Sequence, residues 1–208
     1  MGKKRSVGNL LALAVLSYLT QRPMHPYELS RTLRDNGDVR TIKFTHGSLY
    51  MVVEQLARAG FVAKQETLRE GHRPERTVYR ITDAGRQELH DWLRELVEEP
   101  QYEYPHFVVA LSLIAALPPN EVLTLLHRRL DRLAGQRTEI RSMIDNTLAK
   151  GVPGLFLVEE DYRLALLDAE ASFIERFIGQ ITDPENGWGP EWAQFHGQTF
   201  ATDDRHPS

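Results

Sequence analysis

Residues able to hydrogen bond to a polar ligand cluster at the beginning of one apolar-periodic segment of this 208-residue chain: Thr45, His46, Ser48 and Tyr50. Hydroxyl, imidazole and phenol groups can contact phosphate oxygens or the edges of bases in a groove of nucleic acid. Apolar residues of the same segment recur at positions i, i+3, i+4 and i+7: Leu49, Val52, Val53 and Leu56. This spacing predicts a helix whose apolar stripe faces inward and whose polar N-terminal end faces outward.

The two ends of this predicted helix carry boundary signals. Thr45 is a residue type that caps helix N-termini, and Gly60 is a common stop at the C-terminal end. A DNA-recognition helix presents its N-terminal residues to the major groove. The segment therefore fits a recognition helix, although a stripe of leucine and valine is also the core face of any helix.

A basic hairpin is predicted directly after this helix. Aromatic and β-branched residues form two short runs, Phe61–Val62 and Thr77–Ile81, and the segment between them contains Gly71 and Pro74. Charged loop tips are often only solvated, but a hairpin beside a recognition helix can hold a DNA backbone. The residues expected to contact phosphates from this hairpin are Lys64, Arg73 and Arg76.

Two further helices are predicted before the recognition helix, over Asn9–Thr20 and Pro26–Asn36. Pro26 suits the first turn of a helix, because the N–H that proline lacks is not needed there. Tyr27 follows and is expected near the polar end of the recognition helix. Three helices and a two-stranded hairpin form a winged helix-turn-helix, a fold that reads DNA.

Three motifs of the chain resemble the PadR family of bacterial transcriptional regulators: PYEL over residues 26–29, GSLYM over 47–51 and GHRPERTVYRITDAG over 71–85. The family pairs a Gly-Tyr-Glu entry to the second helix with Gly-Thr/Ser-Leu-Tyr-Pro in the recognition helix and with a basic wing. Pro26, Met51, His72 and Glu75 depart from this pattern. The resemblance implies a homodimeric DNA-binding regulator, commonly a repressor, that responds to aromatic compounds.

Charge is distributed unevenly along the chain. The first 80 residues hold 14 Lys and Arg against 7 Asp and Glu, a net charge of +7, whereas the remainder carry −11. Affinity for duplex DNA comes largely from cations that displace condensed counterions. A chain with a net charge of −4 therefore contains a basic N-terminal region suited to DNA, although a solvated basic face is the simpler alternative.

The second half of the chain is predicted to be all helical. Helical spacing indicates a linker helix over residues 83–97 and a helix over 120–149, which would be about 45 Å long at 1.5 Å per residue. A turn leads to a return helix over residues 155–181, whose apolar face is wide. Two antiparallel helices cannot bury both of their apolar faces alone. We therefore expect the hairpin to pack against a second copy of the chain, as in the longer PadR proteins. A coiled-coil arm in a heteromeric assembly is the alternative.

These elements predict a mainly α chain of three parts: a winged-helix DNA-binding domain with its linker helix over residues 1–99, an all-α antiparallel helical dimerisation domain over 100–181 and a flexible tail over 182–208. A two-fold dimer places two recognition helices about 34–36 Å apart in successive major grooves, and so requires an inverted-repeat operator. The tail contains Pro and Gly breaks, but its heavy apolar residues can dock on a partner subunit or close part of a pocket.

Aromatic residues near the junction of the two domains are candidates for the lining of a small aromatic effector site: Trp92, Tyr102, Tyr104, His106 and Phe107. Ligand pockets are commonly apolar and often lie between domains. Packing between the domains is the simpler explanation of the same side chains.

Composition excludes several classes of protein. The chain has no cysteine, which rules out a disulfide scaffold, thiol catalysis and cysteine-based metal sites, and which agrees with a reducing, cytoplasmic location. Its 8 histidines are scattered without metal-ligand spacing. Neither a Ser/His/Asp order nor a glycine-rich phosphate loop occurs, so we expect no enzyme, no cofactor and no metal.

The basic and apolar beginning of the chain imitates a secretory signal, but Thr20–Pro23 is no small-x-small cleavage site and the apolar run is too short to span a bilayer. We expect no membrane association, and the first basic residues, Lys3, Lys4 and Arg5, can instead act as an arm against phosphates. Two other functions stay open. One is a winged-helix module that binds protein, which an acidic or apolar recognition face would favour; the other is a MarR-like regulator, whose fold has dimerising helices at both ends.

Overall fold

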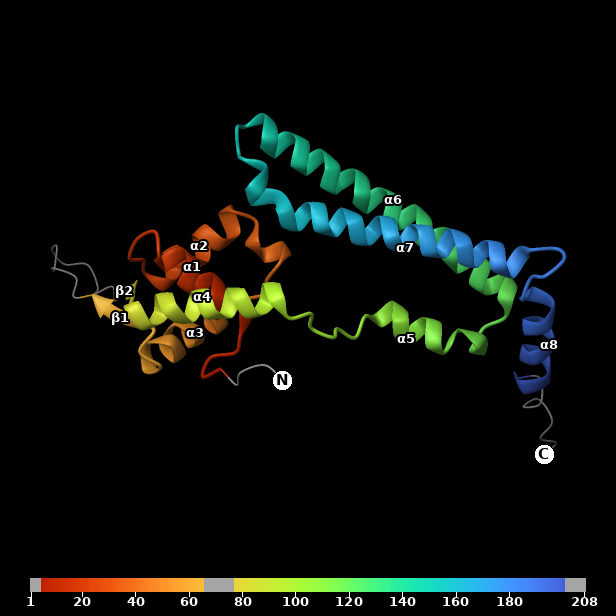
Figure 1. Ribbon diagram of the computed structural model, residues 1–208, viewed down its shortest axis with the longest axis horizontal. Helices are drawn as coiled ribbons and strands as arrows, with labels where there is room; N and C mark the ends of the chain where they lie inside the picture. Colours follow the sequence, from red (N-terminus) through yellow and green to blue (C-terminus); the bar gives the residue numbers. More distant parts are fainter. Residues whose placement is uncertain (1–4, 66–76, 201–208) are drawn as a thin grey trace. The chain divides into compact units, whose positions relative to one another are not determined.

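The computed structural model of the protein describes residues 5–65 and 77–200. The chain divides between Tyr102 and Glu103 into two units, each with its own apolar core (Figure 1). The fold is mainly helical with one two-stranded sheet, which confirms the predicted fold class.

The first unit is a winged helix-turn-helix followed by a fourth helix. Its elements in chain order are α1 (Leu10–Leu19), α2 (Pro26–Asp35), the 3-10 turn η1 (Asp38–Arg40), α3 (His46–Arg58), β1 (Val62–Gln65), β2 (Val78–Ile81) and α4 (Asp83–Glu98). The helices expected from apolar spacing are present, and their ends lie close to the expected residues.

The predicted apolar stripe of α3 lies in the core of the first unit. Leu49 and Leu56 are 0% exposed, and Val52 and Val53 are 3% and 1% exposed. These side chains belong to one cluster with buried residues of α1, α2, both strands and α4. Since burying such a side chain contributes about 1.5–3 kcal/mol, the stripe fixes which face of α3 turns outward.

The hairpin is joined to the helical core at its base. β1 and β2 pair antiparallel, with Val62 opposite Ile81. Met24, between α1 and α2, bridges to Tyr79: the N–H of each donates to the carbonyl oxygen of the other, and both bonds are 3.0 Å long. The direction in which the hairpin leaves the core is therefore set by three backbone segments.

A hydrogen-bonded phenol holds the turn between α2 and α3. Tyr18 Oη donates to Asp38 Oδ2 at 2.6 Å and accepts from Asn36 Nδ2 at 2.8 Å. Gly37 adopts a left-handed φ of 81° at this point, as is common where a helix ends. Burial, with help from Asp38, raises the pKa of Tyr18 to about 12, so the neutral phenol links α1 to this turn at physiological pH.

Arg5 is buried against α4, with a side chain that is 6% exposed. Its guanidinium pairs with Glu88 (Nη1 to Oε1, 2.5 Å) and with Glu95, and lies 5.0 Å from the centroid of the Trp92 ring. Burial lowers the pKa of Arg5, but the two carboxylates outweigh this effect and raise it overall. Arg5 thus fastens the chain to the core, and does not act as the phosphate-binding arm expected from the sequence.

We expect Arg5→Met to lower the free energy of unfolding by about 2–3 kcal/mol, because two partly buried carboxylates lose their shared counter-ion. Urea unfolding at neutral pH measures the loss. The control is Arg94→Met, whose ion pair with Asp91 is exposed and whose expected effect is within about 0.5 kcal/mol. Equal losses in the two variants would show that Arg5 contributes no more than a surface pair.

The second unit is a long helical hairpin with shorter helices at one end. Its elements are α5 (His106–Ser112), the 3-10 turn η2 (Ile114–Ala116), α6 (Pro119–Ala149), the 3-10 turn η3 (Gly154–Leu157), α7 (Val158–Thr182) and α8 (Gly189–Phe200). α6 and α7 lie side by side and run in opposite directions (Figure 1). The return helix begins three residues later than expected, because η3 occupies the residues before it.

The segment from residue 182 to 200 differs from the flexible tail that the sequence analysis expected. α7 continues to Thr182, and α8 packs back on the rest of the second unit. Trp192 Nε1 donates to the carbonyl of Leu117 at 3.0 Å, and the N–H of Trp188 donates to the carbonyl of Gln180 at 2.9 Å. Trp188 and Trp192 therefore dock on their own chain.

Two glycines explain why this docking was hard to foresee. A Cβ at Gly187 would lie 2.2 Å from the carbonyl oxygen of Asp183, and one at Gly189 would lie 2.7 Å from that of Ile181. No other residue type fits such short approaches without movement of the backbone. Glycines that indicate breaks in the sequence are thus positions where the backbone packs closely.

Candidate nucleic-acid interface and ligand groove

The N-terminal end of α3 is closed by a reciprocal capping box between Thr45 and Ser48. Thr45 Oγ1 accepts from the N–H of Ser48 at 3.1 Å, and Ser48 Oγ accepts from the N–H of Thr45 at 2.8 Å. Ser48 holds the place that Glu or Gln usually takes in this motif. Because both hydroxyls are used inside the helix end, these two residues shape that end and leave its other groups to face a ligand.

Two ring pairs join the first residues of α2 to those of α3. Tyr27 stacks on His46 with 5.9 Å between centroids and 10° between planes, and His25 meets Tyr50 edge to face at 6.2 Å. Tyr27 is 59% exposed and Tyr50 is 40% exposed. The residues that the sequence analysis selected on these two helices therefore lie together: Tyr27, Thr45, His46, Ser48 and Tyr50.

The sequence analysis did not select His25, which caps α2. Its Nδ1 accepts from the N–H of Tyr27 at 3.1 Å. The available signal was its position directly before Pro26, since a proline in the first turn places the preceding residue at the cap. Met51 is a second exposed neighbour, at 60%, in the place where the family pattern has proline.

Electrostatics at this surface favour an anion. Free N–H groups and the helix dipole make each helix N-terminus attractive to negative charge. Arg31 and Arg34 of α2 line a shallow cavity of about 200 Å³ together with Tyr27 and His46. Asp35 also lines it and accepts from Arg31 at 3.4 Å. The two adjacent helix ends and the nearby arginines can therefore bind phosphates, while the exposed rings of Tyr27 and Tyr50 extend beyond the phosphates.

The hairpin contributes one described basic residue to the predicted contacts. Lys64 is exposed on β1, opposite Tyr79 of β2. Arg73 and Arg76 lie outside the described residues, and their contact with DNA stays a prediction.

The five residues predicted to line an effector site lie in different surroundings. Trp92 is 5% exposed and belongs to the core of the first unit, because it lies on the inward stripe of α4. Tyr102 and Tyr104 are 78% and 80% exposed, and His106 is exposed at the beginning of α5. Phe107 lines a groove in the second unit.

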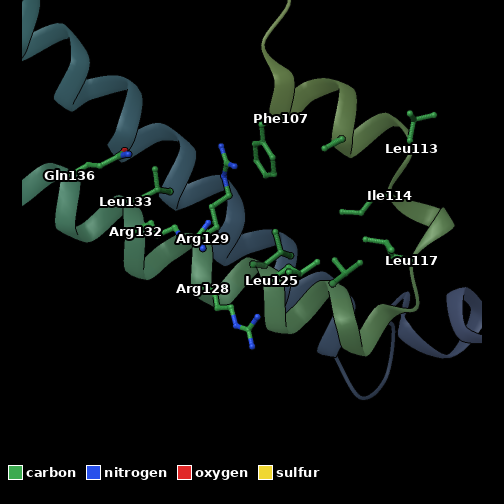
Figure 2. A pocket seen from close by; sticks show the side chains of 13 residues that line it. Phe107, Leu113, Ile114, Leu117, Leu125, Arg128, Arg129, Arg132, Leu133 and Gln136 are labelled. Atoms are coloured by element: carbon green, nitrogen blue, oxygen red, sulfur yellow. The ribbon is translucent and has the colours of Figure 1, made fainter. Parts of the chain in front are cut away.

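That groove has a volume of about 670 Å³ and lies between α6 and the α5–η2 segment. Figure 2 shows apolar side chains entering it from both sides, with Phe107 and Ile114 on one side and Leu125 and Leu133 on the other. The polar residues that line it all come from α6: Arg128, Arg129, Arg132 and Gln136. Sequence reasoning missed this face because arginines on a long helix are usually solvated; the signal was their recurrence at spacings of three and four residues.

The arginines of the groove differ in their contacts. The Arg129 guanidinium lies 3.8 Å from the centroid of the Phe107 ring, and its Nε donates to Glu170 Oε1 of α7 at 2.6 Å. Arg128 and Arg132 make no ion pair within residues 5–65 and 77–200. An apolar wall beside two available cations suits a small apolar molecule that carries an anionic group.

A separate apolar face runs along α7. Three of its side chains are exposed by 61%, 64% and 52% at successive spacings of four residues: Val158, Tyr162 and Leu166. This spacing places them on one side of the helix. The buried residues Ala171, Ile174 and Phe177 belong to the core with α6, so the exposed stripe faces away from the hairpin's own packing.

Among residues 5–65 and 77–200, no three His, Asp or Glu side chains gather so that they could hold a metal ion. In the same ranges, every helix is either too short or too polar to cross a membrane.

Residues 15–91 match the Transcriptional regulator PadR-like family. The chain is also similar to the Negative transcriptional regulator PadR of Bacillus subtilis (strain 168), with 24% identity over 148 residues that cover 71% of this chain and 80% of that protein. The matched range contains the paired ends of α2 and α3.

Solved structures share the fold. Bacillus subtilis PadR in complex with operator DNA has a TM-score of 0.66 and 21% identity, and covers 82% of this chain and 98% of its own. The same protein in complex with p-coumaric acid has a TM-score of 0.64 and 20% identity, with coverage of 86% and 97%. The PadR-like regulator BC1756 from Bacillus cereus has a TM-score of 0.54 at 15% identity, with coverage of 81% and 95%.

Proposed function

We propose that the chain is a member of the PadR-like family of transcriptional regulators, whose pattern matches residues 15–91, and that it is a sequence-specific DNA-binding repressor. It acts in the cytoplasm as a homodimer on an inverted-repeat operator, and a small aromatic effector releases it. The observation that supports this best is the pairing of two helix N-termini through Tyr27 with His46 and His25 with Tyr50.

In the proposed complex, the N-terminal end of α3 enters the major groove. His46 and Tyr50 reach base edges, and Tyr27 lies beside them. The N–H groups of His46 and Gly47, which the capping box does not use, bind a phosphate at the helix end. The hairpin contacts phosphates of the adjacent DNA backbone through three basic residues: Lys64, Arg73 and Arg76.

The proposed dimer forms through the apolar face of α7 defined by Val158, Tyr162 and Leu166. An exposed stripe of this length is unusual on a monomer, and a second copy would bury it. Two-fold symmetry then presents two recognition surfaces to half-sites one helical turn apart.

The proposed effector site is the groove between α6 and the α5–η2 segment. Its apolar wall and its cations, Arg128 and Arg132, suit an aromatic carboxylate, the chemical class of the p-coumaric acid bound to the Bacillus subtilis protein. Of the residues selected from the sequence, Phe107 belongs to this site.

We expect His46→Ala to weaken operator binding about tenfold, because one base-edge or phosphate contact is worth about 1–3 kcal/mol. Fluorescence anisotropy with labelled operator DNA measures the change. Arg58→Ala is the control, since Arg58 is exposed at the opposite end of α3 and its ion pair is on the surface. If Arg58→Ala weakened binding as much as His46→Ala, the assignment of the N-terminal end would be wrong.

The proposal as a whole is tested by mobility shift with DNA from the protein's own promoter region, at two salt concentrations and with competitor DNA. A discrete complex that resists competitor and holds two protomers per site supports the dimeric repressor. Smeared binding that salt abolishes leaves only a basic surface. In that case the exposed rings of Tyr27 and Tyr50 would favour the second candidate, a winged-helix module that binds another protein.

A further inference from the structure

A second groove in the helical unit is lined by aromatic rings. It has a volume of about 370 Å³ and lies among α5, η2, α7 and the beginning of α8. Phe177 is its centre: the centroid distances to Phe173, Trp188 and Trp192 are 5.9, 6.1 and 6.4 Å. Four rings from two helices and the loop between them therefore converge on one concave surface.

The wall of this groove is held in place before any ligand arrives. The indole N–H of Trp192 donates to the carbonyl of Leu117, and the backbone N–H of Trp188 donates to the carbonyl of Gln180. Gly187, directly before Trp188, lies in close contact with the backbone of Ile181 and Asp183 at the end of α7. A preformed wall reduces the entropy lost on binding.

The exposure of the rings separates those that pack from those available to a ligand. Phe177 is 7% exposed and forms the floor, whereas Trp188 is 50% exposed and Phe173 is 37% exposed. A half-exposed tryptophan beside a concavity provides a stacking surface.

The chemistry of the lining selects an uncharged occupant. Of the described residues that line the groove, Gln180 has the one polar side chain besides the two indoles, and none is ionisable. A charged molecule would lose its hydration here without gaining a counter-ion. The carboxamide of Gln180 can instead donate or accept one hydrogen bond.

We propose that this aromatic groove is a second ligand site, which binds a planar, uncharged aromatic compound. One ring of the compound stacks on Trp188, and one polar group hydrogen bonds to Gln180. The site differs in charge from the proposed effector groove, whose polar lining is mainly arginine, and the two share one wall residue, Ile114.

Two dyes with the same ring system separate the two sites. Phenylnaphthylamine is uncharged, and anilinonaphthalenesulfonate carries one negative charge. Each is titrated into the full-length protein, and the rise in dye fluorescence gives the dissociation constant. We expect saturable binding of one phenylnaphthylamine per chain, weakened at least tenfold by Trp188→Ala and by Phe173→Ala.

The controls are Phe195→Ala and Arg132→Ala. Phe195 is 51% exposed on α8 but does not line the groove, and Arg132 lines the other groove. Neither change is expected to alter the affinity for phenylnaphthylamine, whereas Arg132→Ala is expected to weaken binding of the sulfonate.

Three results would overturn the proposal. The first is binding of the uncharged dye that does not saturate, and the second is a loss of dye affinity in the control variants equal to that in Trp188→Ala. The third is a wild-type protein that binds no dye and a Trp188→Ala variant that changes from dimer to monomer, which would assign the groove to a second copy of the chain. The first two results do not bear on operator binding, which is measured separately.

Discussion

Replacing Gly85 by alanine is expected to lower the free energy of unfolding by about 3 kcal/mol or more, a loss typical of forced overlap in a packed site. A Cβ at this position would lie 2.1 Å from the carbonyl oxygen of Phe61 and 2.9 Å from Cγ1 of Ile81. The first turn of α4 cannot move away easily, because Thr82 both caps it and donates to the carbonyl of Gly60 at 2.7 Å. Urea unfolding measures the change.

The matched control is Gly135→Ala in α6, where nothing lies within 4 Å of the added Cβ. There the substitution is expected to stabilise the protein by about 0.5–1 kcal/mol, because alanine loses less entropy than glycine on forming a helix. If Gly85→Ala behaved like Gly135→Ala, the close contact between α4 and the beginning of β1 would not exist in solution.

Introducing a charge into the apolar face of α7 is expected to have the largest effect on DNA binding. Leu166→Glu should convert the dimer to a monomer and weaken operator binding at least about 100-fold, since each half-site must then bind alone. Sedimentation velocity measures the oligomeric state, and mobility shift measures the affinity. Leu166 is 52% exposed, so the change should leave the fold of the monomer intact.

The control adds the same charge at an exposed polar position, Asn146→Glu on α6. It should remain dimeric and bind the operator with unchanged affinity. Should Leu166→Glu remain dimeric as well, the interface would have to lie on another face of the second unit, and the proposed arrangement of the half-sites would change with it.

Local patterns were sufficient to predict the elements of the winged helix. The stripe beginning at Leu49 is buried as its spacing indicated, Thr45 caps α3, and Pro26 opens α2. These features depend on neighbours within a few residues, which the sequence displays directly. The beginning of α7 was less predictable, because the residues of η3 continue the apolar pattern and periodicity does not separate a 3-10 turn from an α-helix.

The site was predictable only where it depends on single helices. The contact of Tyr27 with His46 requires α2 and α3 to meet at a particular angle, and the position of Trp92 depends on which face of α4 packs inward. The role of Arg129 depends on Phe107 and Glu170, which lie far from it in sequence. Such tertiary contacts leave no local pattern, so the sequence did not show that Trp92 belongs to the core of the first unit.

The capping box at the beginning of α3 has a consequence for the kind of sequence that the operator contains. The hydroxyl groups of Thr45 and Ser48 are hydrogen bonded to each other's backbone N–H groups at the end of α3. Residues 45–51 include no Arg, Asn or Gln, the side chains that recognise guanine or adenine through a pair of hydrogen bonds. What this end offers instead is Met51, exposed by 60%, beside the ring of Tyr50. Apolar groups in the major groove recognise the methyl group of thymine. In the proposed complex, an operator in which uracil replaces thymine keeps every base pair yet loses this contact, so we expect it to bind more weakly.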